Sequence, residues 1–161
     1  MDDQETKLPT YWSTSFKELC VGMKVGNDLK FLSINYSASS LYDLIADGKY
    51  RATSLGRQKW KSLINGSSLQ RNCNKEGFNV VGTPAPNWAK ARIGFIGNEQ
   101  NLCHSPDSYL GFGGIASANL RCFSDVNCGV TNVTNTCGNS ATCTPDNGVK
   151  EITAMGCSLV R

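Results

Sequence analysis

The chain has 161 residues and a mass of 17.4 kDa, which suits a single domain and argues against a two-domain enzyme. Charged residues make up only 18% of the chain, and its polarity comes mainly from Asn, Ser, Thr and Gly. The net charge of +3 predicts no nucleic-acid partner, and no stretch approaches the ~20 apolar residues of a membrane span.

Eight cysteines are the strongest compositional signal. Their number is even and no Cys-x-x-Cys pair occurs, so disulfides are favoured over a zinc site. This predicts an oxidising, secreted or extracellular location, and the connectivity stays open. The disulfide candidates are Cys20, Cys73, Cys103, Cys122, Cys128, Cys137, Cys143 and Cys157.

Three Asn-x-Ser/Thr triplets suit a glycoprotein, although such triplets also arise by chance in a chain this rich in Asn and Ser. The glycosylation candidates are Asn35, Asn65 and Asn132. The first ten residues are acidic and polar and have no features of a secretory signal. Either the chain is a piece of a longer precursor, or its cysteines are reduced inside a cell.

The first half of the chain predicts a tail and a hairpin. Residues 1–10 have almost no apolar content and are interpreted as a flexible tail. Apolar residues partly alternate over 11–25 and again over 29–35, with a Gly-Asn-Asp turn between them. This pattern indicates a β-hairpin.

Two short helices are predicted next. Ser39 or Ser40 is placed to cap a helix over 41–45, which Gly48 is placed to end. A second helix is expected over 55–64, capped by Thr53 or Ser54 and ended by an Asn-Gly pair. We expect Trp60 of that helix to face the core.

The second half predicts strands joined by glycine-rich turns. Strands are expected over 78–81, 91–96, 109–115 and 151–160, with a proline turn at Pro84 and Pro86. Residues 116–148 show almost no regular pattern and hold four cysteines, so a disulfide-stapled loop is expected there. The fold class is therefore α+β: one domain over 11–161 with an irregular, mostly antiparallel sheet, two short helices and a long stapled loop.

One irregular stretch has the composition of a calcium site. Residues 97–108 combine amide and carboxylate side chains with a cysteine, and glycines follow at 111–114. Such oxygen atoms on an irregular loop are the ligands that calcium prefers. The alternative is an ordinary turn rich in Asn and Asp.

The stretch 49–75 holds seven basic residues and no acid. On a surface it would attract anionic polymers, whereas the alternative is a solvated face balanced by acids elsewhere in the fold. A hydrolase is disfavoured because His104 is the one histidine in the chain. We therefore expect a non-enzymatic protein.

Several of these motifs together resemble known families. The pairs Asn98-Glu99 and Cys137-Gly138, the stretches 103–107 and 110–114, and the ending 151–161 resemble the C-terminal half of intelectins, which are X-type lectins related to fibrinogen-like domains. The stretches 12–23, 41–50, 56–69 and 73–79 are similar to secreted, ficolin-like fibrinogen-related proteins of cnidarians, including coral skeletal organic matrix proteins. The resemblance implies a fibrinogen-like fold truncated at its N-terminus.

The resemblance also implies a calcium ion that assists glycan binding. By position, Asn98 and Asp107 would be side-chain ligands, His104 stands where a ligand Asn would be, and Pro106 offers its carbonyl. Asp125 is the candidate for a later carboxylate ligand.

Asn132 and Asn135 are the neutral candidates for glycan contact in the same region. The two aromatic residues that frame the sugar in intelectins have no counterpart, since no aromatic residue follows Cys137. The leading expectation is a secreted, lectin-like recognition module that binds glycans with calcium, in which oligomers are possible. The alternative is a structural or adhesive matrix or biomineral protein that binds anionic polymers or mineral.

Overall fold

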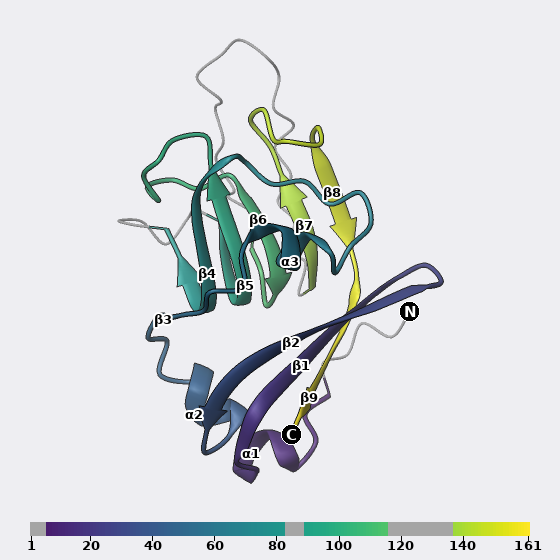
Figure 1. The fold of residues 1–161 in the computed structure, drawn as a ribbon, viewed down its shortest axis with the longest axis vertical. Helices are drawn as coiled ribbons and strands as arrows, with labels where there is room; N and C mark the ends of the chain where they lie inside the picture. Colours follow the sequence, from purple (N-terminus) through teal and green to yellow (C-terminus); the bar gives the residue numbers. More distant parts are fainter. Residues whose placement is uncertain (1–5, 83–88, 116–136) are drawn as a thin grey trace.

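The computed structural model describes residues 6–82, 89–115 and 137–161, which form two antiparallel sheets and three short helices. One sheet has three strands in the order β2-β1-β9, and the other has six in the order β3-β4-β5-β6-β7-β8. Figure 1 shows the six-stranded sheet in the upper part of the molecule and the three-stranded sheet with α1 and α2 below it. The predicted α+β class with a mostly antiparallel sheet is confirmed, although the strands divide into two sheets.

The predicted hairpin is formed by β1 (Phe16–Val25) and β2 (Asp28–Ala38). Val25 pairs with Asp28 across a two-residue turn in which Gly26 has a φ of 59°, a conformation that favours glycine. The expectation that the strand starts near residue 11 is wrong, because α1 (Thr10–Ser13) lies there. Pro9 presets a helical φ, and the Tyr11 amide donates to the Leu8 carbonyl at 2.9 Å.

Both predicted helices are present. The helix α2 (Leu41–Ile45) begins after Ser40, whose hydroxyl accepts from the Asp43 amide at 3.0 Å, as predicted for one of the two cap candidates. The helix α3 (Arg57–Lys61) follows Gly56, so the predicted cap at Thr53 or Ser54 is wrong.

The hydroxyl of Thr53 has a different partner. It donates to the Glu76 carboxylate at 2.6 Å, and that carboxylate also accepts from Trp60 Nε1 of α3. Trp60 is fully buried in the core, as predicted. The Thr53 hydroxyl, which the local sequence predicted to cap a helix, therefore forms a tertiary hydrogen bond to Glu76 instead.

The six-stranded sheet contains the expected strands with shifted ends. Its members are β3 (Arg51–Ala52), β4 (Asn72–Val81), β5 (Lys90–Asn98), β6 (Ser108–Phe112), β7 (Cys137–Ala141) and β8 (Lys150–Thr153). The predicted strand over 151–160 is divided, because Ala154 separates β8 from β9 (Met155–Val160), which pairs with β1 in the other sheet. The proline turn lies outside the described residues.

The strand β7 lies within the stretch that was expected to be an irregular loop, so that expectation is wrong for residues 137–141. Sequence missed β7 because its residues show no apolar alternation. Asn139 is fully buried in it, and its amide nitrogen donates at 2.8 Å to the carbonyls of Ser68 and Tyr109. Hydrogen bonds satisfy this buried polar side chain where apolar packing would be usual.

The main core brings together residues from both sheets and the helices. Its largest fully buried members include Trp60, Phe78, Phe95, Leu19 and Met23. No helix in the described part of the chain is both long enough and apolar enough to cross a membrane.

Cysteine pairing is seen at Cys73, which is bonded to Cys103, and at Cys143, which is also in a disulfide. The expectation that all eight cysteines pair is not met in the described part of the chain, because Cys20 and Cys157 are free thiols. Cys20 lies opposite Leu159 and Cys157 opposite Gly22, so the two are diagonal neighbours. Diagonal partners lie roughly 7–8 Å apart, beyond the usual reach of a disulfide.

The described glycosylation candidates are both exposed. Asn35 lies on β2, and Asn65 follows α3, where its amide nitrogen donates to Asp28 at 2.8 Å. Asn132 lies outside the described residues, as do Cys122 and Cys128.

Candidate functional site

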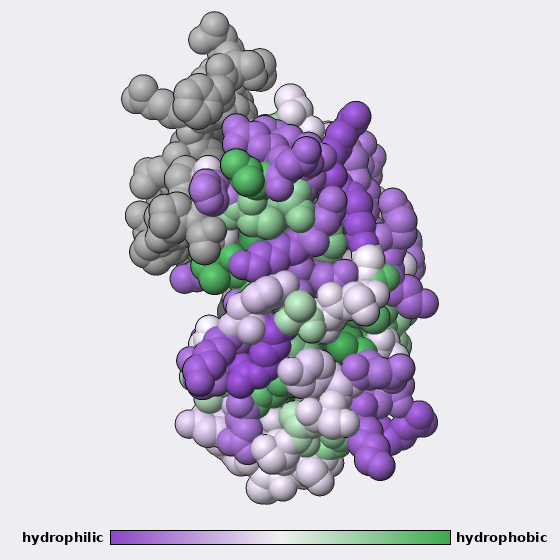
Figure 2. All heavy atoms as spheres, turned by 60° about the vertical axis from the view of Figure 1, so that its left-hand side comes forward, coloured by the Kyte–Doolittle hydropathy of each residue, from purple (hydrophilic) through white to green (hydrophobic). Residues whose placement is uncertain are grey.

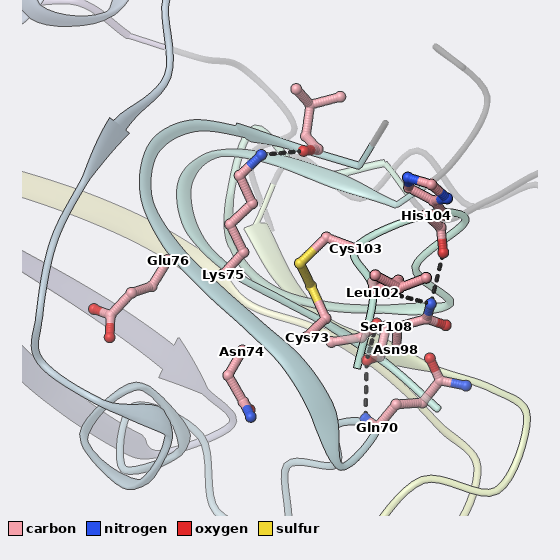
Figure 3. Close-up of a disulfide and its surroundings, with 12 residues drawn as sticks. Gln70, Cys73, Asn74, Lys75, Glu76, Asn98, Leu102, Cys103, His104 and Ser108 are labelled. Carbon is pink, nitrogen blue, oxygen red and sulfur yellow. Dashed lines mark hydrogen bonds between the residues drawn. A yellow bond between two sulfur atoms is a disulfide. The ribbon is translucent and has the colours of Figure 1, made fainter. Parts of the chain in front are cut away.

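The loop that joins β5 to β6 is clamped at its base by the Cys73–Cys103 disulfide, with the two Cα atoms 5.0 Å apart (Figure 3). Cys73 lies in β4 at an irregularity of the β4–β5 register. The carboxamide of Asn98 closes the loop, since its nitrogen donates to the carbonyls of Leu102 and His104 at 2.8 and 2.6 Å. A disulfide and a buried amide thus hold this loop from both sides.

Two carboxylates converge on one buried amide beside the loop. The Nε2 atom of Gln70 lies 3.1 Å from Glu99 Oε2, 3.2 Å from Asp107 Oδ2 and 2.9 Å from the Cys143 carbonyl oxygen. An amide nitrogen carries two hydrogens, so three oxygens share two donors. The site therefore has more oxygen acceptors than hydrogen-bond donors.

The carboxylate of Asp107 also has fewer hydrogen-bond donors than acceptor atoms. Its side chain is buried, and among the described residues its Oδ1 atom has no hydrogen-bond partner. Burial and the neighbouring Glu99 carboxyl, against the lowering effect of Gln70, together raise the pKa of Asp107 from 3.8 to about 7. Near neutral pH Asp107 is therefore partly protonated.

The position of Gln70 depends on its own contacts. The backbone amide of Gln70 donates to Ser108 Oγ at 2.9 Å, and the Ser108 hydroxyl donates to the Gly97 carbonyl at 3.1 Å. A Cβ atom on Gly97 would lie 2.7 Å from the Gln70 carbonyl oxygen, so glycine is needed for this close approach. Gln70 is fully buried, and its side chain contacts both carboxylates.

The backbone around the site is unusual. Five residues near it have a positive φ although none is glycine, and such residues often lie at functional sites. They are Cys73, Asn74, Ser105, Cys143 and Thr144.

The predicted ligand set is assembled only in part. Asp107 directs a carboxylate into the site, but the Asn98 carboxamide is occupied within the loop, its oxygen accepting from the Glu99 amide at 3.0 Å. His104 is exposed, and the carbonyl of Pro106 accepts from the Ala89 amide at 3.1 Å.

Three further predicted residues, Asp125, Asn132 and Asn135, lie outside the described residues. Across residues 6–82, 89–115 and 137–161, no group of three or more His, Cys, Asp and Glu side chains could hold a metal ion. Any ion at this site would therefore depend on two carboxylates together with carbonyl oxygens and water.

Sequence reasoning missed two residues of the site, Glu99 and Gln70. Glu99 follows Asn98 directly, so an acid at each end of the loop was an available signal. No local signal points to Gln70, because it comes from a segment before β4 and reaches the loop only through the fold.

Three of the seven basic residues in the stretch 49–75 contact acids within the fold. Arg57 and Lys61 contact the Asp146 carboxylate at 2.8 and 2.7 Å, and Arg51 contacts Asp47 at 2.8 Å. Burial raises the pKa of Asp146, but hydrogen bonds from Lys61, Arg57 and a backbone amide outweigh it and lower the pKa to about 2. Lys75 donates to the Val81 carbonyl at 2.8 Å. These contacts favour the interpretation that acids elsewhere balance the stretch.

The Cys73–Cys103 bridge offers a test of the clamp. Replacing both cysteines by serine is expected to lower the free energy of unfolding by about 3 kcal/mol, because the bridge closes a loop with a sequence separation of 30. Urea denaturation measures the change. Cys20→Ser, which removes a half-buried free thiol, is the control and should cost less than about 1 kcal/mol. A double variant as stable as the parent would show that the clamp does not stabilise the fold.

In comparisons with protein-family models, with curated proteins and with solved structures, nothing matched this chain.

Proposed function

We propose that this protein is an extracellular, non-enzymatic recognition module in which Glu99 and Asp107 hold a calcium ion that assists glycan binding. The observation that carries the proposal is the excess of oxygen atoms around Gln70 Nε2, together with the unpartnered, buried Oδ1 of Asp107. Leaving a buried acceptor unsatisfied costs about 1–3 kcal/mol, and a bound cation would remove that cost.

The chemistry of the donors favours calcium. Calcium takes 6–8 oxygen ligands from carboxylates, backbone carbonyls and water, and tolerates irregular geometry. The site offers two carboxylates and the Cys143 carbonyl, with neither a thiolate nor an imidazole among these three groups, so a zinc-like site is disfavoured.

The position of Glu99 supports a role in binding. Asp107 is buried whereas Glu99 is exposed, so an ion between them would have one side toward solvent. Water ligands on that side can be exchanged for the hydroxyl oxygens of a glycan. The Cys73–Cys103 bridge would keep the loop beside the ion in one conformation.

The alternative, a matrix protein that binds anionic polymers through residues 49–75, has less support. Arg51, Arg57 and Lys61 contact two acids within the fold, so these three of the seven basic side chains are already engaged.

Calcium binding tests the proposal directly. Titration calorimetry at pH 8 is expected to show one bound calcium ion, with affinity reduced at least roughly tenfold in Glu99→Gln and in Asp107→Asn, because each change removes a charged ligand. Glu151→Gln, which neutralises an exposed acid on β8, should leave the affinity unchanged.

A glycan array run with and without a chelator tests the second half of the proposal. For glycans held at the calcium site, binding that disappears with chelator and in Asp107→Asn is the expected result. A parent protein that binds no calcium, or a Glu151→Gln variant that loses as much affinity as the site variants, would overturn the proposal.

A further inference from the structure

Three aromatic rings gather on the surface where α1 packs against α2. The rings of Trp12 and Tyr42 have centroids 5.0 Å apart at an interplanar angle of 44°, and Tyr11 stands edge-on to Trp12 at 4.8 Å. Tyr11 also lies 6.1 Å from Tyr42. The rings come from different segments and form one contiguous cluster, which we call the aromatic corner.

The aromatic corner is open to solvent. Trp12 is 52% exposed and Tyr42 is 42% exposed, whereas Trp60 is fully buried. None of the four residues of α1 is buried, although Tyr11 is half-buried and packs against the main core. Large aromatic side chains gain most from burial and are enriched at binding interfaces. The exposed rings of Trp12 and Tyr42 therefore offer a surface on which a ligand can pack.

A polar groove is built from the same two chain segments. Ser15 lies three residues after Trp12, Ser39 lies three residues before Tyr42, and both line a groove of about 880 Å³. Ser37 and Asn35 also line it, so its walls offer hydroxyl and amide groups. Its volume is in the range of small-molecule binding sites.

Charged groups complete the groove. Glu18 and Arg161 form an ion pair at 2.7 Å at its edge, and Lys17 also lines it. The groove therefore presents hydrogen-bond donors and acceptors of several kinds.

We propose that the aromatic corner and its groove form a saccharide-binding site for β-linked, gluco-configured pyranose oligosaccharides. In such a sugar the ring substituents are equatorial, so each ring face presents only C–H groups, which pack on an aromatic face. The hydroxyl groups at the edge of the ring would then meet the serine and asparagine side chains of the groove. The site combines an apolar body with a few polar groups that fix orientation, which is typical of ligand sites.

This site is separate from the proposed calcium site. The helices α1 and α2 lie in the lower part of the molecule in Figure 1, whereas Asp107 and the clamped loop join β5 to β6 of the upper sheet. Binding at the aromatic corner should therefore need no calcium, and it does not depend on the calcium proposal.

The surroundings favour a sugar over a lipid surface. A membrane-binding face would be continuously apolar, whereas Lys17, Glu18, Asn35 and three serines line the groove that is built from the same chain segments. In Figure 2 the lower end of the molecule carries mostly residues of intermediate hydropathy, without a broad hydrophobic patch.

The test is titration of the full chain with cellohexaose and with chitohexaose in excess chelator, followed by calorimetry and tryptophan fluorescence. The parent is expected to bind at least one of the two, and Trp12→Ala should weaken that binding at least tenfold. Tyr42→Ala should weaken it in the same direction, whereas Trp12→Phe, which keeps a ring, should retain most of the affinity.

Phe31→Ala is the matched control. Phe31 is 49% exposed on β2 outside the cluster, so its removal deletes a similarly exposed ring and should change affinity less than twofold. Circular dichroism checks that each variant is folded.

Four outcomes would overturn the proposal. They are no binding of either hexaose, an equal loss in Phe31→Ala, loss of binding in Asp107→Asn, and Trp12-dependent binding of phosphatidylcholine vesicles without sugar binding. The third would assign the sugar to the calcium site. Retained binding in Asp107→Asn would support the aromatic corner even if calcium binding fails.

Discussion

Glu76→Gln is expected to lower the free energy of unfolding by about 3 kcal/mol or more. The Glu76 carboxylate accepts four hydrogen bonds, from Thr53 Oγ1 at 2.6 Å, the Leu55 amide at 2.9 Å, the Gly56 amide at 2.7 Å and Trp60 Nε1 at 2.9 Å. A glutamine would place an NH₂ group against some of these donors and leave them unsatisfied. Hydrogen bonds to a charged group contribute about 1.5–3 kcal/mol each.

The measurement is urea denaturation at pH 7, with Glu151→Gln as the control. Glu151 is an exposed acid on β8, and its neutralisation should change stability by less than about 0.5 kcal/mol. A Glu76→Gln variant within about 1 kcal/mol of the parent would contradict the structural role of this carboxylate.

The same contacts predict loss of stability in acid. Burial raises the pKa of Glu76, but hydrogen bonds from Thr53, Trp60 and the Gly56 and Leu55 amides outweigh it, so the folded-state pKa lies below the ordinary value of 4.5. Stability from this group is therefore present above pH ~4.5 and is lost as the pH falls through the folded-state pKa. Glu76→Gln should remove this part of the acid sensitivity.

Asp107→Asn is expected to stabilise the protein at pH 8 in the absence of calcium. The folded-state pKa of Asp107 is raised from 3.8 to about 7, so ionisation at higher pH favours the unfolded chain. The stability lost between pH ~4 and ~7 is on the order of 2–4 kcal/mol. The introduced amide cannot ionise and can donate to the Glu99 carboxylate.

Thermal melts of parent and variant at pH 5 and pH 8 measure this effect. The parent should melt at a lower temperature at pH 8 than at pH 5, and Asp107→Asn should flatten the difference. Calcium added to the parent at pH 8 should restore stability, by about 2.7 kcal/mol at a concentration of 100 times the dissociation constant. A variant with the same pH dependence as the parent would show that Asp107 is not the titrating group.

The pKa shifts of Glu76 and Asp107 have opposite signs. Glu76 is surrounded by donors and is stabilised as an anion, whereas Asp107 faces a second carboxylate and too few donors. Glu76 therefore stabilises the fold as an anion that accepts four hydrogen bonds. Asp107 is the group that we propose exchanges a proton for a calcium ion.

Elements that depend on local sequence patterns were predicted correctly from the sequence. The β1–β2 hairpin follows from alternation around a Gly-Asn turn, and α2 follows from Ser40 and the apolar residues after it. Both depend on backbone geometry and on neighbours within a few residues, so composition and spacing were sufficient to predict them.

Elements stabilised by distant partners do not follow from the sequence. The helix α1 has no apolar period and is held by ring contacts with Tyr42, and β7 is held by the buried amide of Asn139. The site observed differs from the predicted ligand set for the same reason. Asn98 forms hydrogen bonds within its own loop, and Gln70 reaches the site from a segment that precedes β4.

By itself, therefore, the sequence determined a small, cysteine-rich, mostly antiparallel domain with two short helices and one oxygen-rich loop. Only the tertiary structure decided which oxygens share a donor, which acids contact residues 49–75, and which aromatic rings stay in solvent. Alternation and capping act over a few residues, whereas burial, charge pairing and ring contacts join residues that are far apart in the chain.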